Sequence, residues 1–465
     1  MLKIKDFIKN WYFEKGGIKE LFLTSIPLIL SASTTTIQHF IDRLFLSWYA
    51  PEALASSMTA GLFQFTLLSI FIGTAGYTST LVAQYYGAKK SEHIGSIVWQ
   101  GVYVSILGGI FVLFTVPFSS FFFKFLGHPL VIVAFETEYY KYLSYGSFFG
   151  VAAAALSGYF SGQGKTIAIF WGNVLSAFVN LFLDYALIFG NLGFPRLGVK
   201  GAAIATDIAF VSICIYYLLL MATPKYLTKT SFYKKIYPQK VLMLKLFEFG
   251  LPNGIQFFME MIGYSTFLLL VGSLKTAYFS ATTIAFNINN IAFMPMLGLG
   301  LGISVLVGQS MGGKRVDLAK KVTFSGVYLA YIYIVPVCLI YLFFPSFFVN
   351  LFESETAKNF DEIKSCTTIL LRFVAFYTIF DTLNIIFSGT LRGAGDTKFL
   401  FKVVSFMSIF VLIIPTWVVV YIFNAHLYIT WVILSCQVCL LGLIFFLRFK
   451  SGKWEKIKIV DEKPT

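Results

Sequence analysis

Apolar residues along the chain fall into twelve long stretches that short polar segments separate. They lie at roughly 20 to 47, 54 to 86, 94 to 120, 137 to 160, 166 to 190, 198 to 222, 246 to 272, 276 to 308, 322 to 345, 367 to 391, 399 to 423 and 427 to 447. A helix of about 20 residues crosses a hydrocarbon layer of about 30 Å. The pattern therefore predicts an all-α integral membrane protein with twelve transmembrane helices.

Composition and charge agree with this prediction. The 465 residues are 57% hydrophobic and 12% charged, whereas soluble domains carry about 25% charged residues. With the N-terminus placed inside, the 36 Lys and Arg divide into 27 on the inner side, 7 on the outer side and 2 within the spans, Arg43 and Arg372. This distribution predicts a multi-pass protein of the cytoplasmic (inner) membrane with both termini in the cytoplasm. It also explains the net charge of +14 without a nucleic-acid partner.

The second half of the chain repeats motifs of the first half. LVAQYYGAKK at 81–90 matches LVGQSMGGKR at 306–315, and SGYFSGQGKT at 157–166 matches SGTLRGAGDT at 388–397. An even number of spans per half gives both halves the same orientation, so the repeat is parallel with an axis along the membrane normal. We expect an N-lobe at 1–222, a cytoplasmic linker at 223–245 and a C-lobe with a cytoplasmic tail at 246–465.

The Gly164-Lys165-Thr166 end of SGYFSGQGKT is shared with phosphate-binding loops, but the rest of that signature is missing. Tyr159 stands where the loop needs its first glycine, and Asp396 replaces Lys165 in the second copy. A carboxylate repels phosphates, so we expect no nucleotide partner. The glycines instead predict tight turns into the following helices.

Five acidic residues lie well inside the predicted spans, where a charge costs about 2.5 to 3.5 kcal/mol on insertion scales. They are Asp42, Asp184, Asp207, Glu260 and Asp381. His39 shares a helix face with Asp42, and Asn180 shares one with Asp184. Asp42 has a local alternative, an ion pair with Arg43, and Asp207 has a purely structural one. The group is nevertheless the first place to look for function.

The paired motifs, with NLFLDYALIFG after the first SG motif and GVKGAAIAT at 198–206, resemble the multidrug and toxic compound extrusion (MATE) family of the MOP flippase superfamily. The resemblance covers both halves. It implies two six-helix lobes related by a pseudo-twofold axis, with a V-shaped central cavity.

The resemblance also implies roles for single residues. One group of the family couples ions in the N-lobe, at positions that match Asp42, Asn180, Asp184 and Thr206. Another group couples cations in the C-lobe, at positions that match Glu260, eight residues after Pro252, and Asp381. This chain has both sets, so H⁺ and Na⁺ both stay open as the coupling ion, with Na⁺ at Asp184 or at Glu260 and Asp381. Further polar candidates are His39, Asn287, which stands about where eukaryotic-like members have a glutamate, and Asp207, which has no family counterpart.

We therefore expect a monomeric, cation-coupled antiporter that exports organic, cationic and amphipathic compounds by alternating access, in contact with membrane lipids and without a cofactor. A lipid-linked oligosaccharide or lipid flippase of the same superfamily is the alternative, although only Arg43 and Arg372 lie within the spans to bind pyrophosphate. A membrane-embedded enzyme is remote, because the sequence has no HExxH or GxSxG and its four histidines are scattered.

Overall fold

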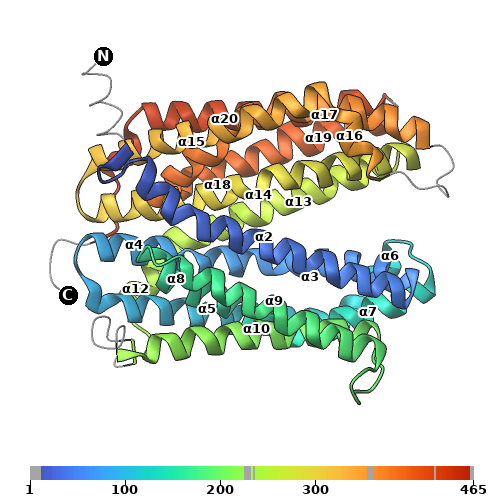
Figure 1. Cartoon of the computed structure of the whole chain (residues 1–465), viewed down its shortest axis with the longest axis horizontal. Coiled ribbons are helices and arrows are strands. Elements are labelled where there is room, and N and C mark those ends of the chain that lie inside the picture. The colour runs from blue at the N-terminus through green and yellow to red at the C-terminus, as the bar shows by residue number, and fades with distance from the viewer. Residues whose placement is uncertain (1–11, 225–231, 234–235, 353–359, 424–425, 461–465) are drawn as a thin grey trace. The chain divides into compact units, whose positions relative to one another are not determined.

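The computed structural model describes residues 12–224, 232–233, 236–352, 360–423 and 426–460, and their regular structure is helical (Figure 1). Part of the linker predicted at 223–245 lies outside these residues. The first half contains α2 (Ile18–Tyr49), α3 (Pro51–Gly76), α4 (Thr78–Gly87), α5 (Ile94–Thr115), α6 (Ser119–Phe125), α7 (Leu130–Tyr145), α8 (Ser147–Gly162), α9 (Ile167–Phe189) and α10 (Val199–Ala222).

The second half begins with α12 (Lys240–Lys245) and a π-helical turn (Leu246–Gly250) that leads into α13. It continues with α13 (Leu251–Gly272), α14 (Thr276–Gly312), α15 (Val316–Phe343), α16 (Pro345–Asn350), α17 (Phe360–Ala394), α18 (Thr397–Phe406), a π-helical segment (Met407–Ile413), α19 (Ile414–Tyr421) and α20 (Leu427–Lys450).

Eleven helical segments of the described chain are long and apolar enough to cross a membrane. The remaining predicted span, at roughly 137–160, consists of α7 and α8. Gly146 separates these two helices with φ −87° and ψ −1°, so that neither is longer than 16 residues. The apolar pattern in the sequence thus located this span but gave no sign of its break.

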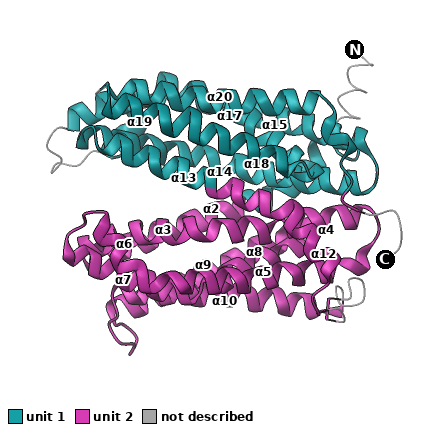
Figure 2. Cartoon of the chain, turned by 180° about the vertical axis from the view of Figure 1, so that it is seen from behind, with its two compact units in different colours: residues 1–29, 259–458 teal, residues 30–258, 459–465 magenta. Residues whose placement is uncertain are grey.

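Contacts divide the chain into two compact units, which Figure 2 shows in different colours. Unit 1 contains residues 1–29 and 259–458, and unit 2 contains residues 30–258 and 459–465. Helix α2 is therefore divided after Ile29 and α13 after Phe258. Each unit contains the first part of the helix that opens the other half of the sequence. The lobe boundaries expected in the loops remain a prediction.

Close backbone contacts at glycines hold these first parts in place. In unit 1, a Cβ added at Gly298 of α14 would lie 2.7 Å from the backbone nitrogen of Ile29. In unit 2, a Cβ added at Gly73 of α3 would lie 2.7 Å from the Cα of Gly254. The two pairs correspond under the sequence repeat. Small residues let helices approach closely in lipid, where burying apolar side chains gains little, so the duplication extends to the packing.

The turns at the repeated motifs are also alike. Gly164 and Gly395 have φ values of 75° and 99°, and Lys89 and Lys314 have φ values of 60° and 57°. These left-handed conformations close the ends of the preceding helices. The turns predicted from the glycines are confirmed, and two lysines adopt a conformation that is uncommon for residues other than glycine.

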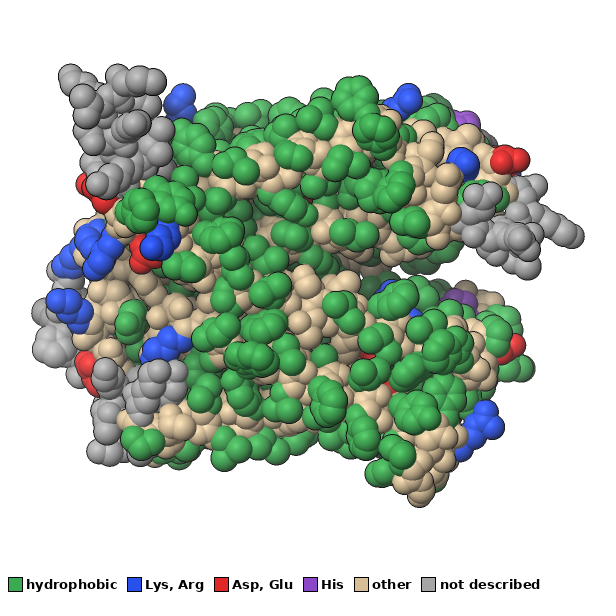
Figure 3. Space-filling model, viewed as in Figure 1, with side chains coloured by type: hydrophobic (Ala, Val, Ile, Leu, Met, Phe, Trp, Pro, Cys, Tyr) green, Lys and Arg blue, Asp and Glu red, His purple; other side chains and the backbone are tan. Residues whose placement is uncertain are grey.

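Large apolar side chains are exposed along the flanks of the helices, and basic side chains gather near the helix ends (Figure 3). Phe121 and Phe343, for example, are 74% and 72% exposed. A soluble protein rarely exposes so much contiguous apolar surface. A surrounding hydrocarbon layer accounts for it.

The glycine contacts predict a position-specific loss of stability. Gly298→Ala and Gly73→Ala each force backbones apart, and we expect each to destabilise the detergent-solubilised protein by about 1 to 3 kcal/mol. Gly76→Ala is the matched control, because a Cβ there meets nothing within 4 Å. Thermal unfolding followed by size-exclusion chromatography measures the difference. Equal unfolding temperatures for all three variants would contradict the contacts.

Candidate ion and substrate sites

Two carboxyl groups meet in the interior of unit 2. Asp184 of α9 is 0% exposed, and Asp42 of α2 is close enough for the two carboxyl groups to share a hydrogen bond. Such a bond needs a proton on one of the groups. Neither oxygen of Asp184 has another partner. The pair therefore cannot be satisfied while both groups are ionised.

Asn180 and Thr206 extend this site from α9 to α10. Asn180 lies one turn before Asp184, is 0% exposed, and donates a long hydrogen bond of 3.5 Å to Thr206 Oγ1. The Thr206 hydroxyl donates to the carbonyl of Ala202 at 3.0 Å. The structure thus brings together the four residues that the family resemblance implied for the N-lobe.

Tyr139 of α7 belongs to the same neighbourhood, and sequence reasoning did not find it. It lies within electrostatic range of Arg43 and of three carboxyl groups, those of Asp42, Asp184 and Asp207. Nothing in the sequence distinguishes it among 26 tyrosines. Only the packing of α7 on α10 reveals its place.

His39 lies beside Asp42, as its position on the helix predicts. Its Nδ1 is 3.8 Å from Asp42 Oδ2, and its side chain is 58% exposed. A contact of this length and exposure contributes little energy. His39 is thus a neighbour of the carboxyl pair at an accessible position.

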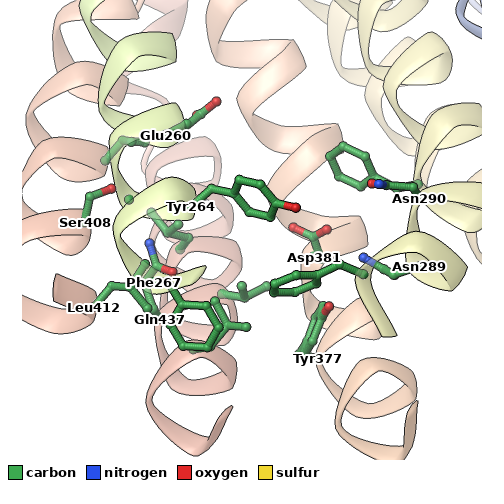
Figure 4. A pocket seen from close by; sticks show the side chains of 17 residues that line it. Glu260, Tyr264, Phe267, Asn289, Asn290, Tyr377, Asp381, Ser408, Leu412 and Gln437 are labelled. Atoms are coloured by element: carbon green, nitrogen blue, oxygen red, sulfur yellow. The ribbon is translucent and has the colours of Figure 1, made fainter. Parts of the chain in front are cut away.

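Unit 1 contains a cavity of about 230 Å³ that is lined by residues of α13, α14, α17, α18, α20 and the π-helical segment 407–413. Glu260 and Asp381 both line it and lie within electrostatic range of each other. In Figure 4 the Tyr264 hydroxyl and the Asn289 side chain point toward Asp381. Asn384 donates a hydrogen bond of 2.9 Å to Asp381 Oδ1. The structure therefore also brings the two C-lobe candidates into one site.

The rest of the cavity is mostly aromatic and aliphatic, and no lysine, arginine or histidine is among its described lining residues. Its aromatic members are Tyr264, Phe267, Phe286, Phe293 and Tyr377. Two carboxyl groups among aromatic rings attract cations through charge and through the ring faces. The cavity is thus suited to part of an organic cation.

Asn287 does not take part in this cavity. It is exposed, whereas Asn289 and Asn290 are among the lining residues. Positions 286, 289, 290 and 293 have the i, i+3, i+4, i+7 spacing of one helix face. That spacing is visible in the sequence and selects the two asparagines that line the cavity.

Comparison with known proteins identifies the family. The family model MatE matches residues 27–186 and 252–418, more than half of the chain. The chain belongs to the MATE family of transporters. The two matched segments begin at Pro27 and Pro252, which are equivalent positions of the repeat.

Relatives and solved structures agree with this assignment. A probable multidrug resistance protein NorM of Thermotoga maritima is 26% identical over 98% of both chains, and the probable multidrug resistance protein YoeA of Bacillus subtilis is 28% identical over 81% of both. Among solved structures, a MOP superfamily transporter from Pyrococcus furiosus has a TM-score of 0.85 at 19% identity, covering 95% of this chain and 97% of its own. A MATE structure in complex with MaL6 has a TM-score of 0.84 at 20% identity, covering 95% and 98%.

Several expectations are thereby confirmed. The protein is a multi-pass membrane transporter of the efflux type with the twelve-helix, two-lobe MATE architecture, and it is not an enzyme. Its substrates are small molecules, and the family needs no cofactor.

The carboxyl pair predicts a pattern of chemical modification. Dicyclohexylcarbodiimide reacts with protonated carboxyl groups in apolar surroundings, so we expect it to label Asp42 or Asp184. In Asp42→Asn, the new amide can donate to the carboxylate of Asp184 and stabilise its ionised form, so labelling of Asp184 should fall several-fold. Peptide mass spectrometry measures this, with the exposed Asp361 as the unlabelled control. Undiminished labelling of Asp184 in Asp42→Asn would contradict a shared proton.

Proposed function

We propose that this MATE transporter is a cation-coupled antiporter that exports organic, cationic and amphipathic compounds by alternating access, with H⁺ as the coupling ion. The observation that carries the proposal is the pairing of the buried Asp184 carboxyl group with that of the partly buried Asp42, which can share a hydrogen bond only when one of them holds a proton.

The energetics of the Asp42 and Asp184 pair favour an ion that binds and is released during the transport cycle. Two like charges about 4 Å apart repel by about 4 kcal/mol at an effective dielectric constant of about 20. A proton removes this repulsion and adds a hydrogen bond between α2 and α9. Entry of water reverses the preference, because water stabilises the ionised groups. Protonation therefore favours one arrangement of these helices over another, and alternating access requires such a bias.

The cavity of unit 1 supports an organic cation as substrate. Its volume of about 230 Å³ is slightly below the range of about 300 to 1,000 Å³ for ligand pockets, so it fits one ring system or the charged end of a larger molecule. Glu260 and Asp381 supply negative charge. Titration of either carboxyl group changes the attraction for a cationic substrate.

Sodium at Asp184, or at Glu260 and Asp381, is the second candidate for the coupling ion. Na⁺ prefers several oxygen ligands, and the carboxylates, asparagine oxygens and tyrosine hydroxyls of the unit 1 cavity are of the right kind. The described residues contain no group of three or more His, Cys, Asp or Glu that could hold a metal ion. The proton is preferred here because a hydrogen bond between Asp42 and Asp184 requires one.

A flippase for pyrophosphate-linked substrates is less well supported. Its cavity would need several cationic side chains to bind the phosphates, and none is among the described residues that line the cavity of unit 1.

The setting of the transporter belongs to the same proposal. The surplus of Lys and Arg on one side of the predicted spans supports the inner membrane with both termini in the cytoplasm. We also propose that the transporter is a monomer and that its two lobes are residues 1–222 and 246–465. It binds neither nucleic acid nor nucleotide.

Transport in proteoliposomes tests the coupling. Outward movement of ethidium should follow an imposed pH gradient in the wild type, and Asp42→Asn should reduce this rate at least tenfold because its pair can no longer hold the proton. Glu260→Gln reports on the other site, and Asp361→Asn is the surface control. Transport driven by a sodium gradient alone, and abolished by Glu260→Gln, would move the coupling ion to unit 1. Absence of any driven transport by folded wild-type protein would refute the antiporter proposal.

Substrate binding tests the cavity separately from coupling. Asp381→Asn removes one negative charge from the cavity while keeping a side chain of the same size. We expect the Kd for ethidium in detergent to rise about five- to fifty-fold, a loss of about 1 to 2 kcal/mol. Fluorescence titration measures the change, and lower ionic strength should enlarge it. An unchanged Kd would exclude Asp381 from the substrate site.

A further inference from the structure

Asp207 occupies a place that the proposed mechanism does not yet use. It follows Thr206 on α10, and its carboxyl group lies against Gly146, where α7 ends and α8 begins. A Cβ added at Gly146 would lie 2.0 Å from Asp207 Oδ1 and 2.1 Å from its Cγ. Only glycine leaves room for this carboxyl group, so the break in the span and the acid fit each other.

Among the described residues, no cation acts on the carboxyl group of Asp207. Its Oδ1 is buried without a hydrogen-bond partner, and the backbone amide of Gly146 is the donor that the carboxyl group faces. Helix α10 packs against α7, α8 and α9. In the described part of these helices, α7 places Tyr139 within electrostatic range of Asp207 and also carries Glu136, Glu138 and Lys141. Helix α8 has no charged residue, and α9 contributes Asp184.

Tyr139 connects Asp207 with the carboxyl pair. It lies seven residues before Gly146, which places both on one face of α7. Tyr139 is within electrostatic range of Asp207 and also of Asp42, Asp184 and Arg43. Three carboxyl groups thus lie within electrostatic range of one tyrosine.

The helix break offers partners for both states of an acid. The backbone amide of Gly146 can donate to an ionised carboxylate. The last turn of α7 has carbonyl groups that lack partners within the helix, and a protonated carboxyl group can donate to one of them. Gain of a proton at Asp207 would change its carboxyl group from an acceptor only to a group that can also donate, at the point where the span is divided.

We propose that Asp207 is a third proton-carrying group of unit 2, which exchanges a proton together with the Asp42 and Asp184 pair during transport. This proposal rests on the proposed proton coupling. It assigns Asp207 a second role beyond filling the space beside Gly146, and it predicts that more than one proton is exchanged per substrate.

Proton release on substrate binding tests this proposal. Ethidium is added to the purified protein in weakly buffered detergent solution, and a pH-indicator dye counts the protons released per bound ethidium. Asp207→Asn keeps the size of the side chain and cannot titrate, so we expect it to release about one proton fewer than the wild type. Infrared difference spectra between low and high pH should also lose one carbonyl component of a protonated carboxyl group. A structural acid would leave both readouts unchanged, and that result would overturn the proposal.

Two glycine variants test whether the position of the Asp207 carboxyl group matters as well as its presence. Gly146→Ala displaces the carboxyl group and should lower the proton count as Asp207→Asn does. Gly150→Ala is the control on α8, because its Cβ would meet Phe210 of α10 at an ordinary 3.6 Å. If Gly146→Ala does not fold, the Asp207→Asn comparison decides alone. If the wild type itself releases no proton, the proposed coupling fails and this proposal with it. If the wild type and Asp207→Asn release equal numbers, only the role of Asp207 fails.

Discussion

The cost of burying the carboxyl group of Asp184 beside a second acid is the constraint on which the proposed ion chemistry depends. An ionised group inside a protein is stable only with partners that replace its hydration. Asp184 is fully buried, and its near neighbour is another acid, Asp42. A mobile ion must supply the missing positive charge, or a proton must remove the negative one. When both carboxyl groups are ionised, the pair lacks a partner for its charge. Binding of a proton or another cation supplies that partner and can therefore shift a conformational equilibrium.

The scaffold around these acids depends on close packing at glycines rather than on large apolar contacts. Gly73 and Gly298 let equivalent helices approach at backbone distance in the two units. Backbone contacts of this kind do not allow the two helices to slide along each other. Helices α2 and α13 are therefore held firmly along their first parts. Their later parts carry Asp42 and Glu260. A change of interactions at these acids acts on helices that are fixed at one end, which suits bending more than translation.

Much of this organisation can be predicted from the sequence, and the features that cannot be predicted have physical reasons. The spans and the repeat follow from hydrophobic length and from motifs such as SGYFSGQGKT, because lipid imposes both. The acids Asp42, Asp184, Glu260 and Asp381 stand out because charge is rare in a span. Tyr139 and Asn289 do not stand out, since their residue types are common there and only packing gives them neighbours. The break at Gly146 was also missed, because a glycine in an apolar run does not by itself end a helix.

The two acid sites are not copies of each other, although the halves that carry them are. Under the repeat offsets of 225 and 231 residues, Asp42 corresponds to Phe267 and Glu260 to Thr35, while Asp184 corresponds to Pro415 and Asp381 to Gly150. Equivalent backbone positions thus carry an acid in one half and a neutral residue in the other. Phe267 lines the cavity of unit 1 at the position where unit 2 has Asp42. Divergence on a shared scaffold has produced a closed carboxyl pair in one unit and an aromatic cavity with two acids in the other. Under the proposed function, this division gives the coupling ion and the substrate separate sites, so that each can be occupied without displacing the other directly.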